Sequence, residues 1–205
     1  MKIQYSEIKK NNGVFEKSPI LEEDYNFIYD FINSNNGQIK STIETGMAFG
    51  FSTIAIMSAT DTKHIAIDPF QFKFYRNKGL TNIRSHFSDT KGLDFTLIED
   101  FSFNALPHLL KDTKSFDFCF IDGSHTFEDA FCDFFYMDKM LNQFGYLLIH
   151  DTWMPALQKV STFISTNKSE NYVSIPLPET LKDHMALYQK VKTNNRKHED
   201  YFIQF

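Results

Sequence analysis

The chain has 205 residues, a formal net charge of −5 and ordinary fractions of apolar and charged residues. This length predicts one folded domain around one core. The acidic balance argues against a general binder of nucleic acid or of anionic membranes, because such binding needs clustered cations.

The cysteines and the N-terminal segment predict a cytoplasmic protein. Cys119 and Cys132 form no C-x-x-C pair and indicate no disulfide framework, which is typical of a reducing compartment. The first residues, "MKIQYSEIKKNNG", lack the apolar run of a signal peptide. No segment approaches the length of a membrane span, so we expect no membrane partner.

The first long element in chain order is an amphipathic helix within "KSPILEEDYNFIYDFINSNNG" (residues 17–37). Its apolar residues recur at helical spacing, Ser18 can cap it, and Pro19 suits its first turn. We therefore expect residues 1–40 to form a helical segment, which is a candidate cap over a substrate.

Strands and helices alternate from residue 41 onward. The expected helices are 51–59, 72–87, 103–111, 126–141 and 155–165, and the expected strands are 41–45, 64–68, 95–100, 116–122 and 145–151. Continuous apolar strands separated by helices predict a parallel sheet covered on both faces. Residues 171–177 and 184–191 follow with no helix between them, so we expect them to pair as an antiparallel hairpin at one edge.

Acidic residues stand at the carboxyl end of each expected parallel strand. They are Glu44, Asp68, Glu99 with Asp100, Asp122, and Asp151. Ligands of open α/β sheets bind at this edge. Carboxylates gathered there repel one another and lose hydration unless a ligand offsets both costs. The pattern therefore predicts a ligand-binding crevice.

The residues after the first strand indicate the kind of ligand. Gly46 and Gly50 have three residues between them, which differs from the G-x-G-x-x-G of dinucleotide sites. Glu44, just before this turn, would repel a pyrophosphate and attract a cation. Asp68, at the next strand end, is placed to accept hydrogen bonds from ribose hydroxyls. A cationic nucleoside without phosphate, such as S-adenosylmethionine, fits both features.

Three stretches resemble one family. "IETGMAFGFST" (residues 43–53) resembles motif I of class I S-adenosylmethionine-dependent methyltransferases. Residues 116–134 and 145–153 resemble later motifs of their small O-methyltransferase branch, the methyltransferase-24 type, which is similar to macrolide-sugar and catechol-type enzymes. The resemblance covers residues 42–191 and implies a Rossmann-like, doubly wound α/β fold. Its seven strands would follow the order 3-2-1-4-5-7-6, with strand 7 antiparallel and helices on both faces.

The same resemblance implies domain bounds and cofactor contacts. It makes residues 1–205 a single methyltransferase domain with a core at 41–191 and a tail at 192–205. The residues that would contact S-adenosylmethionine are Glu44, Gly46, Met47, Gly50, Ser52, Asp68, Asp100, Phe101, Ser102 and Asp122. Two alternatives stay open: an ordinary turn could by itself require the glycines, and Ser102 could cap the helix that follows it.

The resemblance also implies catalytic residues. His125, in "DGSH", matches the general base of the sugar-methylating relatives, and Asp122 and Asp151 would hold a divalent cation such as Mg²⁺ or the acceptor hydroxyl. His150 would join these two acids as a metal ligand, although Thr152 and His150 depart from the patterns of metal-dependent relatives. The remaining histidines have no comparable setting: His64, His86, His108, His184 and His198.

We therefore expect an enzyme that methylates a hydroxyl of a small metabolite or sugar, and the resemblance makes a homodimer one expected assembly. Two other classes stay open. A non-catalytic protein that binds a nucleoside cofactor fits the sequence as well, because little of the chain is left for a substrate lid. A nicotinamide-dependent oxidoreductase is opposed by Glu44 and by the wide glycine spacing.

Overall fold

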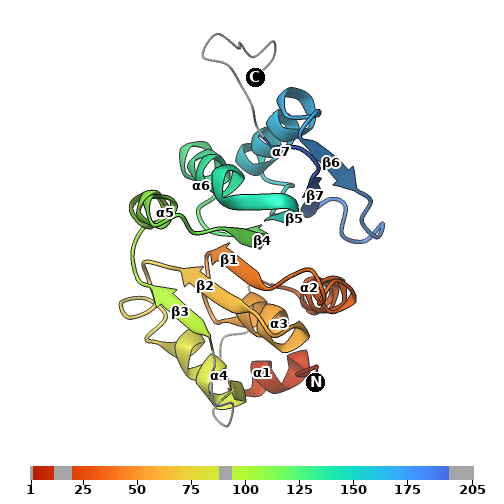
Figure 1. Ribbon diagram of the computed structural model, residues 1–205. Helices are drawn as coiled ribbons and strands as arrows, with labels where there is room; N and C mark the ends of the chain where they lie inside the picture. The colour runs from red at the N-terminus through yellow and green to blue at the C-terminus, as the bar shows by residue number, and fades with distance from the viewer. Residues whose placement is uncertain (1, 12–19, 88–93, 194–205) are drawn as a thin grey trace. The chain divides into compact units, whose positions relative to one another are not determined.

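The computed structural model describes residues 2–11, 20–87 and 94–193, and its seven strands follow the order β3-β2-β1-β4-β5-β7-β6 (Figure 1). This order and the antiparallel β7 confirm the predicted Rossmann-like fold. The chain divides into two compact units, residues 1–105 and 106–205. No helix of the described residues is long and apolar enough to cross a membrane.

The first unit holds three parallel strands, of which β2 lies between β1 and β3. The strands are β1 (Ser41–Thr45), β2 (Lys63–Ile67) and β3 (Phe95–Ile98). The helices are α1 (Tyr5–Asn11), α2 (Glu22–Ser34), α3 (Phe51–Ala59), α4 (Lys78–Phe87) and α5 (Ser102–Lys111), and the boundary between the units falls within α5. The carboxyl ends of β1 and β2 lie side by side.

The N-terminal helices are fixed by buried tyrosines. The Tyr25 hydroxyl donates to the Ile3 carbonyl at 2.7 Å, and the Tyr5 hydroxyl donates to the Ile20 carbonyl at 2.9 Å. Helix α2 begins at Glu22, where the backbone N–H of Leu21 donates to Asp24 at 3.0 Å. The predicted cap and first turn, Ser18 and Pro19, lie outside the described residues, as do residues 194–205 of the predicted tail.

The helix predicted over residues 72–87 is shorter than expected, because α4 begins only at Lys78. Arg76 and Asn77, just before it, have left-handed φ angles of 51° and 57°, which a helix cannot include. The Asn77 N–H donates back to the Gln71 carbonyl at 2.7 Å, so residues 69–77 form an ordered turn region. Sequence periodicity alone does not report these two backbone angles.

The second unit holds a parallel pair and an antiparallel extension. Strand β4 (Phe116–Ile121) pairs in parallel with β5 (Leu141–His150), and β7 (Met185–Lys190) pairs antiparallel with both β5 and β6 (Tyr172–Ile175). This confirms the predicted hairpin. Helices α6 (Phe127–Met140) and α7 (Pro155–Asn167) pack against each other and against this sheet.

Strand β5 starts four residues earlier than predicted, at Leu141 rather than Gly145, because Leu141 already pairs with Phe116 of β4; the register then shifts between Phe116 and Phe118. Gly145 is required at this irregularity. A Cβ there would lie 2.7 Å from Leu141 Cδ1 and 2.9 Å from the Asp117 carbonyl oxygen. After the shift the pairing is regular, which brings the ends of β4 and β5 to the same edge.

A buried ionic cluster attaches the hairpin to the helices. Asp138 on α6 accepts from the Lys168 ammonium at 2.9 Å and from the Tyr172 hydroxyl at 2.7 Å, and the Lys190 ammonium lies 3.5 Å away. Burial alone would raise the pKa of Asp138, but Lys168, Tyr172 and Lys190 outweigh it and lower that pKa. Because breaking a buried ion pair is costly, this cluster fixes β7 beside β5.

Candidate active site

The predicted site residues form two clusters, one in each unit. The first follows β1, β2 and β3 in residues 1–105, and the second follows β4 and β5 in residues 106–205. Each cluster has its own chemistry.

Glu44, in the first cluster, is completely buried. One of its oxygens, Oε1, accepts from the Thr53 hydroxyl and lies 3.2 Å from His64 Nε2. His64 Nδ1 in turn lies 2.8 Å from the Thr42 hydroxyl. The other oxygen, Glu44 Oε2, has no hydrogen-bond partner among the described residues. A buried polar atom without a partner costs free energy, so this oxygen suits a donor group of a ligand.

His64 is a component of this cluster that we did not expect from the sequence. It lies on β2 directly beside Thr42 of β1 in the parallel register. The available signal was a histidine inside an otherwise apolar strand, next in space to a strand ending in a carboxylate. Without the register, nothing in the sequence pairs His64 with Glu44.

Asp68 holds the glycine loop in shape. Its Oδ2 accepts from the backbone N–H groups of Met47 at 3.0 Å and Ala48 at 2.7 Å, and its Oδ1 accepts from the Phe70 N–H at 2.8 Å. The Gln71 amide adds a fourth hydrogen bond, to Oδ2, at 3.1 Å. This distribution of donors leaves Oδ1 with spare acceptor capacity. Its predicted contact with ribose stays a prediction.

The loop itself contains three left-handed residues. Gly46 and Gly50 have φ angles of 84° and 81°, and Ala48 has 44°. Glycine adopts this region without steric cost, so the turn alone would explain both glycines. Gly79 on α4 closes the loop from outside: a Cβ there would lie 2.4 Å from the Ala48 carbonyl oxygen and 2.8 Å from Gln71 Oε1. We did not predict Gly79, because it is distant in sequence.

Two further residues expected at the cofactor have buried side chains. Met47 and Ser52 are each 2% exposed. The Met47 side chain ends beside Gly79, where its Cε would lie 2.9 Å from a Cβ added to that glycine. The part of Met47 that shapes the loop is its backbone N–H, bonded to Asp68. Contacts of either side chain with a cofactor stay predictions.

The residues after β3 begin a helix. Asp100 Oδ1 accepts from the Phe101 N–H at 2.7 Å and from the Asn104 amide at 3.0 Å, just ahead of α5. Asp100 therefore accepts hydrogen bonds just ahead of α5, and Ser102 is the first residue of that helix. The Phe101 ring is 45% exposed and packs edge-on against Phe70 at a centroid distance of 5.9 Å.

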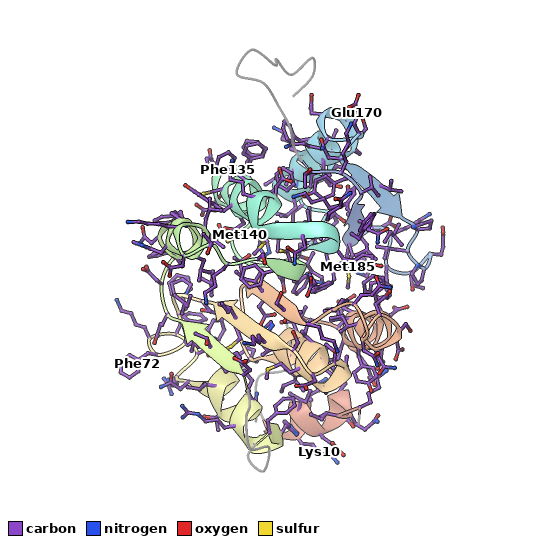
Figure 2. The ribbon with its side chains drawn as sticks, viewed as in Figure 1. Lys10, Phe72, Phe135, Met140, Glu170 and Met185 are labelled. Atoms are coloured by element: carbon purple, nitrogen blue, oxygen red, sulfur yellow. The ribbon has the colours of Figure 1, made fainter. Side chains whose placement is uncertain are left out.

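The second cluster alternates carboxylates and imidazoles. His125 Nε2 lies 2.9 Å from Asp151 Oδ2, and His150 Nδ1 lies 3.1 Å from Asp122 Oδ1 and 3.4 Å from Asp151 Oδ2. The Trp153 indole donates to Asp151 Oδ1 at 2.8 Å. Asp151 has a left-handed φ of 53°. These distances show that the structure brings together all four residues predicted here, namely Asp122, His125, His150 and Asp151. His150 ends β5, where it is paired with Met185 of β7, which Figure 2 labels.

The two carboxylates have opposite pKa shifts. Burial raises the pKa of Asp122, and the nearby His150 opposes this only in part. Burial would also raise the pKa of Asp151, but hydrogen bonds from His125, His150 and Trp153 outweigh it and lower that pKa. Neighbouring acids whose pKa values are pushed apart take different roles in proton chemistry. Asp151 is therefore the stronger acid of the pair.

His125 can accept a proton. Its hydrogen bond with Asp151 is the main cause that raises its pKa above the ordinary 6.5, against an opposing effect of burial. Because ionised Asp151 can only accept, Nε2 of His125 donates to it and the neutral ring has its lone pair on Nδ1. The side chain is 42% exposed, so a ligand can reach the ring.

The same cluster offers ligand atoms for a metal. Asp122, His125 and Asp151 each contribute one, and these three atoms lie within 4.8 Å of one another. Carboxylate oxygens suit hard cations, and an imidazole extends the set toward transition ions. The sequence predicted His150, and not His125, as the third ligand; His150 approaches both carboxylates from a buried position, at 4% exposure.

The comparisons with known proteins identify the class. A family model described as a methyltransferase domain, of the methyltransferase-24 type, matches residues 43–152, a little over half of the chain. The chain belongs to this family, and the predicted resemblance is confirmed. A search of curated protein sequences finds no match.

Solved structures with this fold include O-methyltransferases. A Staphylococcus aureus protein provisionally assigned as a caffeoyl-CoA O-methyltransferase is 18% identical with a TM-score of 0.71, covering 92% of this chain and 93% of its own. The Bacillus cereus O-methyltransferase solved with S-adenosylhomocysteine is 13% identical (TM-score 0.69; 90% and 89%). TomG of Streptomyces achromogenes, an O-methyltransferase of tomaymycin synthesis solved with S-adenosylmethionine, is 14% identical (0.70; 94% and 91%). At these identities, the likeness establishes the fold alone.

Proposed function

We propose that this protein transfers a methyl group from S-adenosylmethionine to a hydroxyl of a small metabolite or sugar. The observation that carries the proposal is the hydrogen-bonded pair of His125 and ionised Asp151 in a methyltransferase-family domain. The free cysteines support a cytoplasmic site of action. Residues 1–205 would act as one catalytic domain.

The residues of the first cluster fit the cofactor. Glu44 Oε2 is a buried acceptor without a partner among the described residues, which suits the ammonium of the methionine moiety. The left-handed Gly46 and Gly50 let the backbone approach a ligand closely, and Asp68 Oδ1 keeps capacity for a ribose hydroxyl. Asp100 and Phe101 would lie at the adenine. When bound, S-adenosylmethionine supplies an electrophilic methyl group.

His125 would remove the proton from the acceptor. An aliphatic hydroxyl ionises far above neutral pH, so it must lose its proton as the methyl group arrives. Nδ1 of His125 accepts this proton, and Asp151 stabilises the imidazolium that forms. A positioned base of this kind contributes about 10²–10⁴-fold to the rate.

A divalent cation at the same cluster is the second candidate arrangement. The three ligand atoms of Asp122, His125 and Asp151 carry this alternative. The two arrangements compete, because a cation bound to His125 and Asp151 would replace the hydrogen bond that makes His125 a base. A cation would instead lower the pKa of the acceptor hydroxyl directly.

Calorimetric titration with S-adenosylhomocysteine tests cofactor binding. We expect micromolar affinity for the wild type, a loss of about tenfold or more for Glu44→Gln because one charge-assisted contact is removed, and no change for the exposed control Glu22→Gln. Absence of binding in the wild type would overturn the proposal, and binding of a nicotinamide dinucleotide in its place would indicate the oxidoreductase.

Turnover tests the acceptor and the cation. S-adenosylhomocysteine release is measured with a panel of sugars and catechols, first with EDTA and then with Mg²⁺ or Mn²⁺. Activity that persists in EDTA supports His125 as base, and activity only with added metal supports the cation. Cofactor binding without turnover of any acceptor in the panel would favour the non-catalytic protein.

A further inference from the structure

A row of buried polar side chains extends from Glu44 along one face of the sheet. Side chains of a strand alternate between its two faces, so Thr42 and Glu44 of β1 share a face. His64 of β2 is paired with Thr42 in the parallel register and lies on the same face. These three side chains are at most 1% exposed. The row therefore belongs to the interior of the first unit, where α3 packs against β2 (Figure 1).

The row is a continuous chain of hydrogen bonds that ends on one oxygen of Glu44. The hydroxyls of Thr62 and Thr42 lie 3.2 Å apart, and the Thr42 hydroxyl lies 2.8 Å from His64 Nδ1. His64 Nε2 lies 3.2 Å from Glu44 Oε1, to which the Thr53 hydroxyl of α3 also donates. Linked hydrogen bonds inside a protein polarise and strengthen one another. The Glu44 carboxylate is thus held from β2 and from α3.

The directions of these hydrogen bonds follow from the carboxylate. An ionised carboxylate only accepts hydrogen bonds, so Nε2 of His64 carries the proton that faces Glu44 Oε1. In the neutral ring, Nδ1 then accepts from the Thr42 hydroxyl, at the shortest of the distances that this hydroxyl makes. The partner of one ring nitrogen fixes the tautomer and orientation of a histidine. Thr42 therefore keeps the N–H of His64 directed at Glu44.

The two oxygens of Glu44 have different surroundings. Oε1 lies against both His64 and Thr53, whereas Oε2 is buried and has no hydrogen-bond partner among the described residues. Because both donors are on Oε1, rotation of the carboxylate would break two hydrogen bonds. These contacts therefore hold Oε2 in one orientation, as the acceptor that is left for a ligand. A group oriented in advance loses less entropy when the ligand binds.

We propose that His64 is a positioning residue for the cofactor. Through its hydrogen bond to Oε1, it holds Glu44 so that Oε2 accepts from the ammonium of the methionine moiety, and Thr42 supports His64 in turn. This role rests on the proposed function, because it takes S-adenosylmethionine as the ligand of Glu44. Its consequence is selective: His64 contributes to the affinity for ligands that carry the amino group and not to the affinity for ligands that lack it.

A purely structural role of His64 predicts a different result. The His64 ring stacks on Phe95 of β3 at a centroid distance of 6.0 Å, so its loss could simply weaken the packing of the first unit. Weaker packing would lower the affinity for every ligand of the site alike. A positioning role lowers the affinity only for ligands that contact Glu44. Two ligands that differ in the amino group therefore separate the two roles.

Calorimetric titration with two nucleosides is the first test. S-adenosylhomocysteine carries the ammonium, whereas methylthioadenosine has the same adenosine and thioether without the amino-acid part. His64→Phe keeps a ring against Phe95 and removes the hydrogen bond. We expect this variant to bind S-adenosylhomocysteine about tenfold more weakly, because a charge-assisted contact is misplaced, and methylthioadenosine within about twofold of the wild type. His64→Gln, whose amide can donate to Oε1, should restore the first affinity to within about threefold.

A double-mutant cycle with Glu44→Gln is the second test. If His64 acts through Glu44, adding His64→Phe to Glu44→Gln should weaken S-adenosylhomocysteine binding by no more than about twofold. Thr42→Val leaves the His64 ring in place, so it keeps the role testable even where His64→Phe does not fold. It should weaken S-adenosylhomocysteine binding about threefold. Thr60→Val is its matched control, because it removes a buried hydroxyl that donates to the Ile39 carbonyl instead, and it should change neither affinity.

Three results would overturn this role. They are equal weakening of both nucleosides by His64→Phe, unchanged affinity for S-adenosylhomocysteine in His64→Phe or Thr42→Val, and full additivity of His64→Phe with Glu44→Gln. In each of them the wild type still binds S-adenosylhomocysteine, so the proposed methyl transfer is unaffected. A wild type that binds neither nucleoside would remove the proposed function, and the role of His64 with it.

Discussion

The clusters at the ends of β1–β2 and of β4–β5 both begin with strand-end acids, yet they differ in accessibility and in partners. Glu44 and Asp68 are at most 3% exposed, and their donors are mainly backbone N–H groups and neutral side chains. Asp122 and Asp151 are 11% and 20% exposed at the side chain, and their partners are two imidazoles and the Trp153 indole, whereas the first cluster has, among the described residues, a single imidazole, that of His64 beside Glu44. The same sequence signal therefore produced one buried, hydrogen-bonded cluster and one partly exposed cluster in which acids lie beside imidazoles.

This difference separates the expected effects of substitution. Changes in the first cluster alter the shape of the glycine loop and should affect folding stability and cofactor affinity together. Changes in the second cluster leave the backbone largely intact, so they should affect turnover and its pH dependence while cofactor affinity is kept. A substitution in either cluster that changed both cofactor affinity and the pH dependence of turnover would contradict this distinction between the clusters.

The largest effect is expected for His125→Ala. Loss of the proton acceptor should lower kcat by about 10²–10⁴-fold, while the affinity for S-adenosylhomocysteine stays within about twofold, which is a small free-energy change. Steady-state kinetics and calorimetry give the two values. The control is His108→Ala, an exposed histidine of α5, which should change neither. Equal losses of kcat and affinity would assign His125 to cofactor binding instead.

Gly79→Ala should have the next largest effect. This effect should be on folding stability and cofactor affinity, whereas that of His125→Ala should be on turnover. The new methyl group would lie 2.4 Å from the Ala48 carbonyl oxygen, so α4 or the glycine loop must move. Overpacking of this kind costs about 1–3 kcal/mol in the free energy of unfolding, measured by urea denaturation, and should weaken S-adenosylhomocysteine binding. Gly37→Ala is the matched control, since a Cβ at that position would meet no atom within 4 Å. A stable Gly79→Ala variant with normal affinity would show that the loop tolerates displacement.

The element order and the strand-end acids could be predicted from the sequence because both depend on local patterns. Apolar runs marked β1 and β4, and the acids that follow them are adjacent in the chain. The start of α4 could not be predicted in the same way. Its delay to Lys78 depends on the left-handed Arg76 and Asn77, and the hydrogen bond from the Asn77 N–H to the Gln71 carbonyl forms only in the folded chain.

The residues that contact each acid could not be predicted from the sequence either. Asp68 was expected to face a ribose, and its hydrogen bonds from Met47 and Ala48 were not expected. His64 was given no role, and it contacts Glu44. Both sets of contacts depend on the register of β1 against β2, which places residues about twenty positions apart side by side. The residue types predicted where polar groups lie together, and the register of β1 against β2 determines which of these groups contact one another.

The smallest effect, and the most specific to the second cluster, is expected in the pH profile of Asp151→Asn. In the wild type, Asp151 raises the pKa of His125 above 6.5, so kcat/KM should rise with pH through a midpoint above that value as the base loses its proton. Removing the negative charge should lower the His125 pKa and move the midpoint down by about one pH unit, with a reduced plateau because the ring is no longer held by the anion. Asp183→Asn, an exposed acid, serves as the control. A midpoint that does not move would show that another group titrates, and that Asp151 orients the site without tuning its base.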